Sequence, residues 1–331
     1  MTKPRLSICI ATYNRAQYIG ETLESIIPQL TDDVEIVIVD GASTDDTRSV
    51  VKRYAENCQQ IHYTQLPSKG GVDYDYCKAV ELAHGEYCWL FTDDDLFKPG
   101  AIRTVLNEIG KAYSVIVVNA QGMNSDFSEI LDEQRLRINR NEVYSECQME
   151  QLFSRAVSYM SFIGSIVIQR ELWMQREKKQ YFGTEFIHVG VIFQAALPAP
   201  ALIIAEPYIT VRLGNFQWTP RAVDVWMSQW PNLLFSFTHI PEKIRGRYQM
   251  TNPWRRLKVL ILCREMGAYS LKEYRRLFAA KEASLGWRFT GRLIALLPVC
   301  FVKFFMLPYR KFKERLLRWK ITRGKNAINI P

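Results

Sequence analysis

Short apolar runs alternate with segments of helical periodicity through the first 120 residues of this chain. The runs are Leu6–Ala11, Val34–Val39, Ile61–Thr64, Tyr87–Phe91 and Val115–Val118. Apolar runs of this length are typical of strands that are buried on both faces of a sheet. Because helices separate them, the pattern predicts an α/β fold, with a mostly parallel sheet covered by helices on both faces.

Polar residues follow three of these runs, at the point where each strand would leave the sheet. They are Thr12 to Asn14, Asp40, and the three consecutive carboxylates Asp93, Asp94 and Asp95. Ligands of parallel sheets bind beyond the carboxyl ends of the strands, so we expect these groups to meet in one crevice. A hard divalent cation, Mg2+ or Mn2+, would relieve the repulsion between the three carboxylates. The alternative interpretation of Asp93 to Asp95 is a solvated acidic turn.

Composition limits the class of protein. The chain has 331 residues and 48% apolar content, enough for one large α/β domain with an appendage, or for two domains. Its seven cysteines are odd in number and show no CxxC spacing, which argues against a disulfide framework or a zinc ribbon. The first residues lead directly into a predicted strand, without the apolar region of a signal peptide, so we expect a body in the reducing cytoplasm.

The net charge of +9 is concentrated at the C-terminal end. From Lys281 onward there are twelve Lys and Arg residues against two Glu, so the rest of the chain is close to neutral. A nucleic-acid-binding protein would carry basic residues on its folded body. The distribution therefore predicts no nucleic-acid partner.

Three motifs in order resemble those of the family 2 glycosyltransferases, which have the Rossmann-like GT-A fold. They are Ser7-Ile-Cys-Ile-Ala-Thr-Tyr-Asn-Arg15, Val37-Ile-Val-Asp-Gly-Ala-Ser-Thr-Asp-Asp-Thr47 and Gly85-Glu-Tyr-Cys-Trp-Leu-Phe-Thr-Asp-Asp-Asp95. The resemblance implies an inverting, metal-dependent transferase that uses a nucleotide-activated sugar. By motif position, it implies that base and ribose are held by Thr12, Tyr13, Asn14 and Asp40, with Ser43 and Asp45 as further candidate contacts.

The resemblance also suggests roles at the diphosphate and the metal. Asp93 and Asp95 are the expected metal ligands, and Asp94 is an expected donor contact. Gly71 would let the backbone approach the diphosphate and Asp73 could meet the sugar, although both fit an ordinary loop equally well. After the predicted strand Ala201–Val211, Arg212 could pair with a diphosphate oxygen and Trp218 could stack on a sugar, the alternative being a surface Arg and a core Trp.

The catalytic base is expected in Tyr181-Phe-Gly-Thr-Glu-Phe-Ile-His188, because an inverting transfer needs a base beside the acceptor hydroxyl. The family often has an acidic pair here, and this sequence departs from it with Glu185 followed by Phe186. Glu185 is the chemically conventional base. The pattern Gly-Thr-x-x-x-His is similar to the abequosyltransferase-type subgroup of bacterial O-antigen synthesis, which implies that His188 is a metal ligand, a base or an orienter of the acceptor. A packed histidine and an exposed first-turn acid are the alternatives.

Residues 221 to 285 have helical patterns, and an apolar segment flanked by basic residues follows at about 287–322. With about 17 apolar residues, Lys303 inside and two prolines, the segment is a poor spanning helix but suits an interfacial helix on anionic lipid. A tail helix packed on the body is the alternative. We therefore expect a peripheral protein on the cytoplasmic face of the bacterial inner membrane.

These observations divide the chain into a nucleotide-sugar-binding half at residues 1–120, an acceptor-binding half at 121–220 and a helical, basic C-terminal region at 221–331. The subgroup resemblance favours a CDP-linked dideoxyhexose such as abequose; UDP-, dTDP- and GDP-linked donors stay open. It implies an undecaprenyl-diphosphate-linked acceptor in O-antigen or surface polysaccharide synthesis. The rival functions are a nucleotidyltransferase of related fold, for which Thr12-Tyr-Asn-Arg15 lacks the expected glycines, and a non-catalytic membrane scaffold that binds nucleotide sugar.

Overall fold

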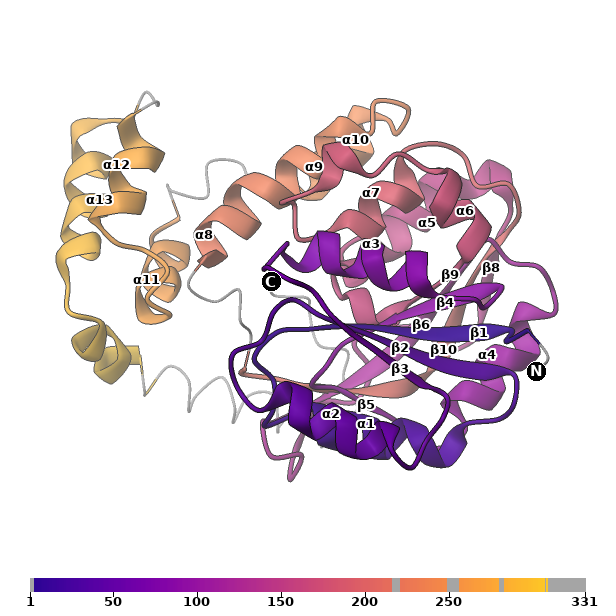
Figure 1. The fold of residues 1–331 in the computed structure, drawn as a ribbon. Coiled ribbons are helices and arrows are strands. Elements are labelled where there is room, and N and C mark those ends of the chain that lie inside the picture. Colours follow the sequence, from indigo (N-terminus) through magenta and orange to yellow (C-terminus); the bar gives the residue numbers. More distant parts are fainter. Residues whose placement is uncertain (1–2, 216–220, 249–255, 280–282, 307, 309–331) are drawn as a thin grey trace. The chain divides into compact units, whose positions relative to one another are not determined.

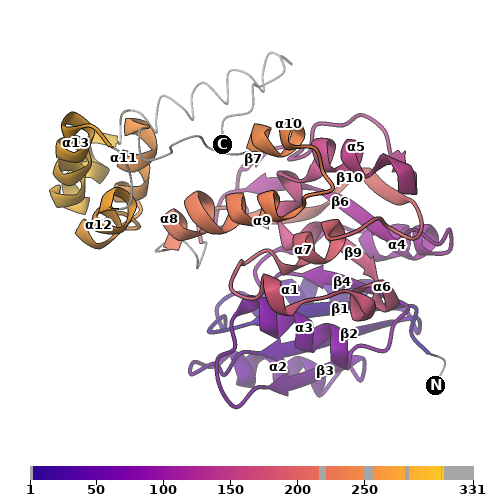
Figure 2. The same cartoon turned by 90° about the horizontal axis from the view of Figure 1, so that it is seen from above.

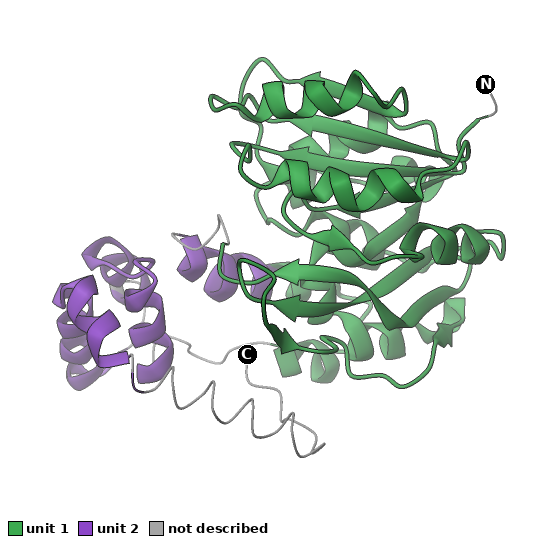
Figure 3. Cartoon of the chain, turned by 90° about the horizontal axis from the view of Figure 1, so that it is seen from below, with its two compact units in different colours: residues 1–215, 233–248 green, residues 216–232, 249–331 purple. Residues whose placement is uncertain are grey.

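A computed structural model describes residues 3–215, 221–248, 256–279, 283–306 and 308. The chain divides into two compact units, residues 1–215 with 233–248 and residues 216–232 with 249–331 (Figure 3). Residues 233–248, which the sequence analysis grouped with the C-terminal region, belong to the first unit. We call the first the catalytic unit, because it carries the predicted site, and the second the helical unit.

One curled sheet forms the centre of the catalytic unit (Figure 1). Its strands are β1 Leu6–Thr12, β2 Val34–Asp40, β3 Ile61–Gln65, β4 Tyr87–Phe91, β5 Leu96–Phe97, β6 Val115–Met123, β7 Ile130–Asp132, β8 Glu142–Tyr144, β9 Ile166–Gln169 and β10 Ala201–Arg212. Their order is β3-β2-β1-β4-β9-β6-β10-β5, with β7 beside β6 and β8 beside β10. Pairing is parallel from β3 to β4 and between β6 and β10, so the prediction of a mostly parallel sheet is confirmed.

Strand β9 departs from the simple alternation. It lies between β4 and β6 and runs antiparallel to both. Residues 120–150 contain the end of β6 and the short strands β7 and β8. The second half of the sheet is therefore more mixed than the first, as is common for large sheets.

Helices cover both faces of the sheet. Those of the catalytic unit are α1 Ile19–Ile26, α2 Thr47–Ala55, α3 Val72–Leu82, α4 Ala101–Ile109, α5 Met149–Ala156, α6 Arg170–Gln175, α7 Ile187–Phe193 and α10 Glu242–Arg245. Helices α1 and α2 lie on one face and α3 on the other (Figures 1 and 2). Strand order changes direction between β1 and β4, which is the point of such a sheet where ligands are expected to bind.

The core explains why the apolar runs of the sequence become strands. All five residues of β4, from Tyr87 to Phe91, are fully buried, and β1 and β2 are buried almost throughout. Trp89 donates its indole N–H to the Gly164 carbonyl at 2.9 Å, which satisfies the one polar group of the largest core side chain. The polar ends of the strands are thus held on a rigid support.

The helical unit has a separate apolar core. Its helices are α8 Ala222–Asp224, α11 Leu257–Glu265, α12 Leu271–Ala279 and α13 Leu285–Leu296, while α9 Trp230–Ser236 has residues in both units. The core gathers side chains from α8, α11, α12 and α13: Ala222, Val223, Leu260, Cys263, Ala268, Tyr269, Leu277, Phe278, Ile294 and Ala295. Trp218 and the basic residues from Arg310 onward lie outside the described residues.

Candidate functional site

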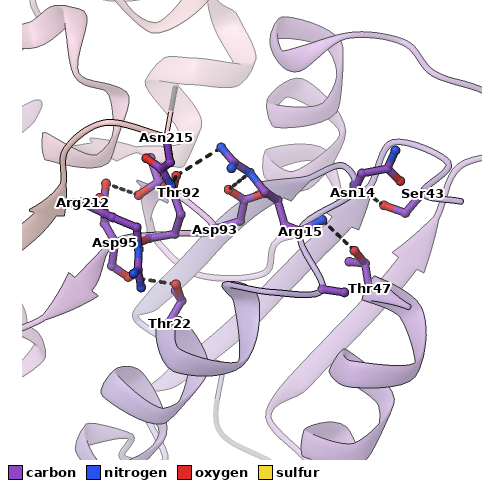
Figure 4. Close-up of polar contacts among 12 residues, drawn as sticks. Asn14, Arg15, Thr22, Ser43, Thr47, Thr92, Asp93, Asp95, Arg212 and Asn215 are labelled. Carbon is purple, nitrogen blue, oxygen red and sulfur yellow. Dashed lines mark hydrogen bonds and ion pairs between the residues drawn. The ribbon is translucent and has the colours of Figure 1, made fainter. Parts of the chain in front are cut away.

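The carboxyl ends of β1, β2 and β4 lie side by side, as the parallel register requires. Thr12 pairs with Asp40 across β1 and β2, and Ile10 pairs with Phe91 across β1 and β4. The segment after β4 therefore faces the loop that follows β1 (Figure 4). The predicted convergence of three polar strand ends is present in the structure.

We call Asp93, Asp94 and Asp95 the acid corner. All three side chains are nearly buried, and Arg15, from the loop after β1, pairs with two of them. Its Nε lies 3.3 Å from Asp93 Oδ1 and its terminal nitrogen lies 3.1 Å from Asp94 Oδ2. Asn215 also donates its amide N–H to Asp94 Oδ2 at 2.8 Å. A side-chain cation therefore bridges two of the three carboxylates (Figure 4).

Asp95 is held by the protein rather than by Arg15. Its Oδ1 accepts the backbone N–H of Arg212 at 2.8 Å, and its Oδ2 accepts the hydroxyl of Thr92 at 2.5 Å. Burial, and then the charge of Asp94, raises the pKa of Asp95 to about 8, and the same two causes raise the pKa of Asp93 to about 7. Both causes disfavour the ionised carboxylates, so a positive charge placed beside the acid corner would stabilise them.

The predicted metal set is not assembled as expected. Among the described residues, no three His, Cys, Asp or Glu side chains gather around one point. His188 lies fully buried in α7, where its Nε2–H donates to the Met160 carbonyl at 2.6 Å. His188 is therefore not brought together with Asp93 and Asp95 as a third ligand, which corrects that expectation. The oxygen donors of the corner still suit Mg2+ or Mn2+, since such ions are often held by one or two carboxylates together with water and substrate phosphates.

The loops after β1 and β2 are bound to each other. Asn14, in the left-handed region with φ 53°, donates its backbone N–H to Ser43 Oγ at 2.8 Å. Asp40 is fully buried, and its two oxygens accept the Ser43 backbone N–H at 2.7 Å and the Tyr63 hydroxyl at 2.6 Å. The structure thus brings Asn14, Asp40 and Ser43 together with Thr12, but it also engages the Asp40 carboxylate in protein contacts.

Two other predicted donor contacts are Tyr13 and Gly71, and both are associated with the segment that leads into α3. The Lys69 ammonium stands over the Tyr13 ring, 3.6 Å from its centroid, which is a cation–π contact. Gly71 precedes the helix with φ 94°, a conformation that favours glycine. The flat ring of Tyr13 and the bare backbone at Gly71 are both compatible with nucleotide binding.

Asp73 has a structural role that the sequence analysis did not predict. Its buried carboxylate accepts the backbone N–H of Glu185 at 3.0 Å and that of Ile187 at 3.1 Å, so it anchors the segment that leads into α7. Burial raises the pKa of Asp73 to about 6, although both hydrogen bonds act against that rise. Asp73 therefore supports the backbone at Glu185, and its contact with the sugar stays a prediction. Glu185 itself has φ 69°, and such strain in a residue other than glycine is often found at functional sites.

Arg212 is buried and does not lie at the surface. Its guanidinium donates to the carbonyls of Asp94 and Ser125 and to the Glu21 carboxylate. It also stands over the Phe127 ring, 4.0 Å from the centroid. Each nitrogen of the guanidinium thus has a protein partner, and the donor contact of Arg212 stays a prediction.

Two residues of the site were missed by the sequence analysis. Arg15 stands in the first motif, and its position directly after Asn14 was the available signal. Asp75 lies in the first turn of α3, where its carboxylate is buried beside Gly41. A carboxylate at a helix start looks like an ordinary dipole partner in sequence, so nothing singled it out.

The fold and these polar strand ends define the class: a doubly wound α/β protein with polar groups at the carboxyl edge of its parallel strands and an acidic corner beside them. Residues 7–169, just under half of the chain, match the glycosyl transferase family 2 model, and this part of the chain resembles that family. The fold is GT-A. The relatives of the chain act in bacterial polysaccharide synthesis, and together with the family they indicate a hexosyltransferase.

The chain is 28% identical over 223 residues to the abequosyltransferase RfbV of Salmonella typhimurium, covering 63% of this chain and 67% of that protein. It is 30% identical over 117 residues to a GalNAc(5)-diNAcBac-PP-undecaprenol beta-1,3-glucosyltransferase of Campylobacter jejuni, covering 35% of this chain and 38% of the relative. The aligned region thus spans well under half of this second relative.

Solved structures of similar fold include S. aureus TarS 1-349 in complex with UDP-GlcNAc, with a TM-score of 0.57, 15% identity and coverage of 98% of this chain and 93% of that one. The mannosyltransferase PcManGT of Pyrobaculum calidifontis, in complex with GDP-Man and Mn2+, has a TM-score of 0.52, 18% identity and coverage of 98% and 89%. At these identities the likeness concerns the fold.

Proposed function

We propose that this chain is an inverting, metal-dependent glycosyltransferase that moves a sugar from a nucleoside diphosphate to a lipid-linked oligosaccharide in bacterial surface polysaccharide synthesis. The observation that carries the proposal is the meeting of three family motifs at one sheet edge, with the acid corner beside the loops after β1 and β2. A dideoxyhexose such as abequose, from a CDP-linked donor, is the proposed substrate, supported by the similarity to an abequosyltransferase.

Glu185 is the proposed general base. It lies at the entrance of α7, is partly exposed, and has its backbone held by the buried Asp73. His188 is a poorer candidate because burial lowers its pKa to about 4 and closes it from solvent. In the proposed transfer, the acceptor hydroxyl oxygen attacks the anomeric carbon while the bond from that carbon to the diphosphate breaks. The hydroxyl proton passes to the Glu185 carboxylate, and the nucleoside diphosphate leaves with the bonding electrons.

The acid corner is proposed to stabilise the leaving group. Asp93 and Asp95 would hold a divalent cation, with Asp94 beside them, and a bound cation would neutralise the charge that develops on the diphosphate. This assignment is supported by the oxygen chemistry of the corner and by the presence of Mn2+ in the complex of PcManGT. Arg15 already places one positive charge between Asp93 and Asp94.

Turnover with the full chain tests this proposal. CDP-, UDP-, dTDP- and GDP-linked sugars are offered with an undecaprenyl-diphosphate-linked acceptor, with Mn2+, Mg2+ or a chelator, and the glycolipid product is detected by mass spectrometry. We expect transfer from one nucleotide class, abolished by the chelator and reduced about 100-fold or more in Glu185→Gln with donor affinity unchanged. Donor binding without turnover would favour a scaffold, and full activity in Glu185→Gln would remove it as the base.

The helical unit is proposed to bind the cytoplasmic face of the inner membrane. Among the described residues no single helix suffices to cross a bilayer; α13 and the following helix, Val299–Met306, meet the length and composition criteria only as a pair bent by 98°. Both expose apolar side chains at helical spacing: Leu285, Phe289, Leu293 and Leu296 in the first, and Phe301, Phe304 and Phe305 in the second. Residues 309–322 of the predicted membrane segment lie outside the described residues.

An interfacial helix needs an apolar stripe and basic flanks. Phe289 is 71% exposed and Phe304 is 68% exposed, and Arg292 and Lys303 lie nearby in sequence. Co-sedimentation with anionic and zwitterionic vesicles tests the proposal, since Phe289→Gln with Phe304→Gln should weaken anionic binding at least tenfold. Val143→Gln, which changes an exposed residue of the catalytic unit, is the matched control. Equal binding by all variants would contradict an interfacial role.

A further inference from the structure

The Asp75 carboxyl is buried without the partners that a buried charge requires. Asp75 lies in the first turn of α3 and is 4% exposed, and its Oδ1 has no hydrogen-bond partner among the described residues. Its Oδ2 lies against the backbone of Gly41, where an added Cβ would stand only 2.6 Å from that oxygen. An unpaired buried carboxylate makes the folded state less stable. The stability of the folded chain therefore does not explain why Asp75 is buried here, whereas the binding of a ligand would.

The neighbouring Asp40 gives the contrast. Its two oxygens accept hydrogen bonds from Ser43 and Tyr63, so its strongest acceptor positions are already used within the protein. The carboxylate of Asp75 lies against Gly41, the residue after Asp40. Burial, and then the charge of Asp40, raises the pKa of Asp75 to about 6. At this corner of the sheet, Asp75 is thus the carboxyl group with an oxygen left for a ligand.

The surroundings of Asp75 belong to the proposed donor site. Gly41 directly follows β2 and donates its backbone N–H to the Thr12 carbonyl at 2.9 Å, which joins Asp75 to the ends of β1 and β2. Lys69, whose charge acts against the rise in the Asp75 pKa, stands over the Tyr13 ring. A buried hydrogen-bond acceptor, an aromatic face and an ammonium group therefore occur within one small region.

We propose that Asp75 accepts a hydrogen bond from the nucleoside part of the donor, either a base N–H or a ribose hydroxyl, and thereby sets donor affinity. The inference rests on the proposed function, because it requires that a nucleotide bind at this edge. A bound N–H or O–H would satisfy the orphan oxygen, and hydrogen bonds to charged groups are among the stronger ones. Asp75 is then a specificity-determining residue, while Asp40 maintains the shape of the site.

Calorimetric titration of the full chain with CDP, UDP, GDP, dCDP and inorganic diphosphate, with Mn2+ present, tests the assignment. Asp75→Asn should lower affinity for the preferred nucleoside diphosphate about tenfold or more and leave inorganic diphosphate binding unchanged. Thermal stability should stay equal or rise, because the substitution removes an unpaired buried charge. Glu81→Gln, which removes one charge from the last turn of the same helix, is the matched control and should change neither quantity.

The titrations with different nucleotides distinguish a contact with the base from a contact with the ribose. An effect of Asp75→Asn that is present with CDP and lost with dCDP assigns the contact to the 2′-hydroxyl, whereas an effect that follows the base assigns it to a base N–H. Normal affinity in Asp75→Asn, or a lowered melting temperature, would overturn the inference while leaving the transferase proposal intact. Failure of the unmodified chain to bind any nucleoside diphosphate would overturn both.

Discussion

Replacing Arg212 by Met separates a structural role from a ligand role. The side chain is buried and donates to two backbone carbonyls, those of Asp94 and Ser125, and to the Glu21 carboxylate. Removing it leaves both carbonyls without a side-chain donor, at a cost of about 1–3 kcal/mol each. The lost contact with the Phe127 ring adds about 0.5–2 kcal/mol. The Glu21 pair adds little, since that carboxylate is half exposed and screened by water.

The sum for Arg212→Met is about 2.5–8 kcal/mol, a large part of the roughly 5–15 kcal/mol that stabilises an ordinary protein. For a unit of this size it corresponds to a fall in melting temperature of roughly 5–30 °C. Calorimetry or urea unfolding of the full chain measures it. Glu21→Gln is the control, because it removes only the exposed partner and should cost less than about 1 kcal/mol. Unchanged stability in Arg212→Met, together with a selective loss of donor affinity, would refute this reasoning and restore Arg212 as a diphosphate ligand.

Three further predictions follow from other contacts. Gly85→Ala should destabilise the chain by a few kcal/mol in urea unfolding, because its Cβ would stand 2.7 Å from the Ser7 backbone nitrogen; a neutral effect would mean that β1 can shift. Asp73→Asn should lower kcat about tenfold or more with donor affinity unchanged, since an NH2 donor replaces one of the two oxygens that each accept an N–H at the entrance of α7; equal kcat would contradict its positioning of Glu185. Burial acts to raise the pKa of Glu35, but hydrogen bonds led by the Ser7 hydroxyl outweigh it, so its folded pKa lies below its usual value of 4.5. Its stabilisation is therefore present above pH 4.5 and lost as pH falls through the folded pKa, and Glu35→Gln should flatten that part of a stability–pH curve.

The first half of the sheet was predictable because its strands carry their own signals. Each of the runs that became β1, β2 and β4 is mostly apolar and leads into a polar residue at or just after its end, so local pattern and tertiary position agree. Strand β9 was harder to place. Nothing within Ile166–Gln169 tells that it inserts between β4 and β6 in the opposite direction, because that pairing depends on two distant segments.

The site was less predictable than the fold, since sequence does not reveal which way a side chain faces. All seven residues of α7 are buried, so the run around His188 has no polar face from which its orientation could be deduced. Asp73 and Asp75 are two positions apart in one helix, yet one anchors a distant backbone and the other has an oxygen without a partner. Only the three-dimensional structure distinguishes a carboxylate that holds the backbone of the site from one that has an oxygen available to bind a ligand.

The number of protein partners already engaged offers a general way to rank the polar residues of this edge. The Asp40 carboxylate and the Arg212 guanidinium already form hydrogen bonds within the protein, so a ligand would have to replace those bonds. Arg15 is different, because its ion pairs with Asp93 and Asp94 join two loops through charges that a diphosphate or a cation could equally well satisfy. In the proposed function, donor and cation would then compete for the same ion pairs, and by linkage the affinity for each would depend on the other.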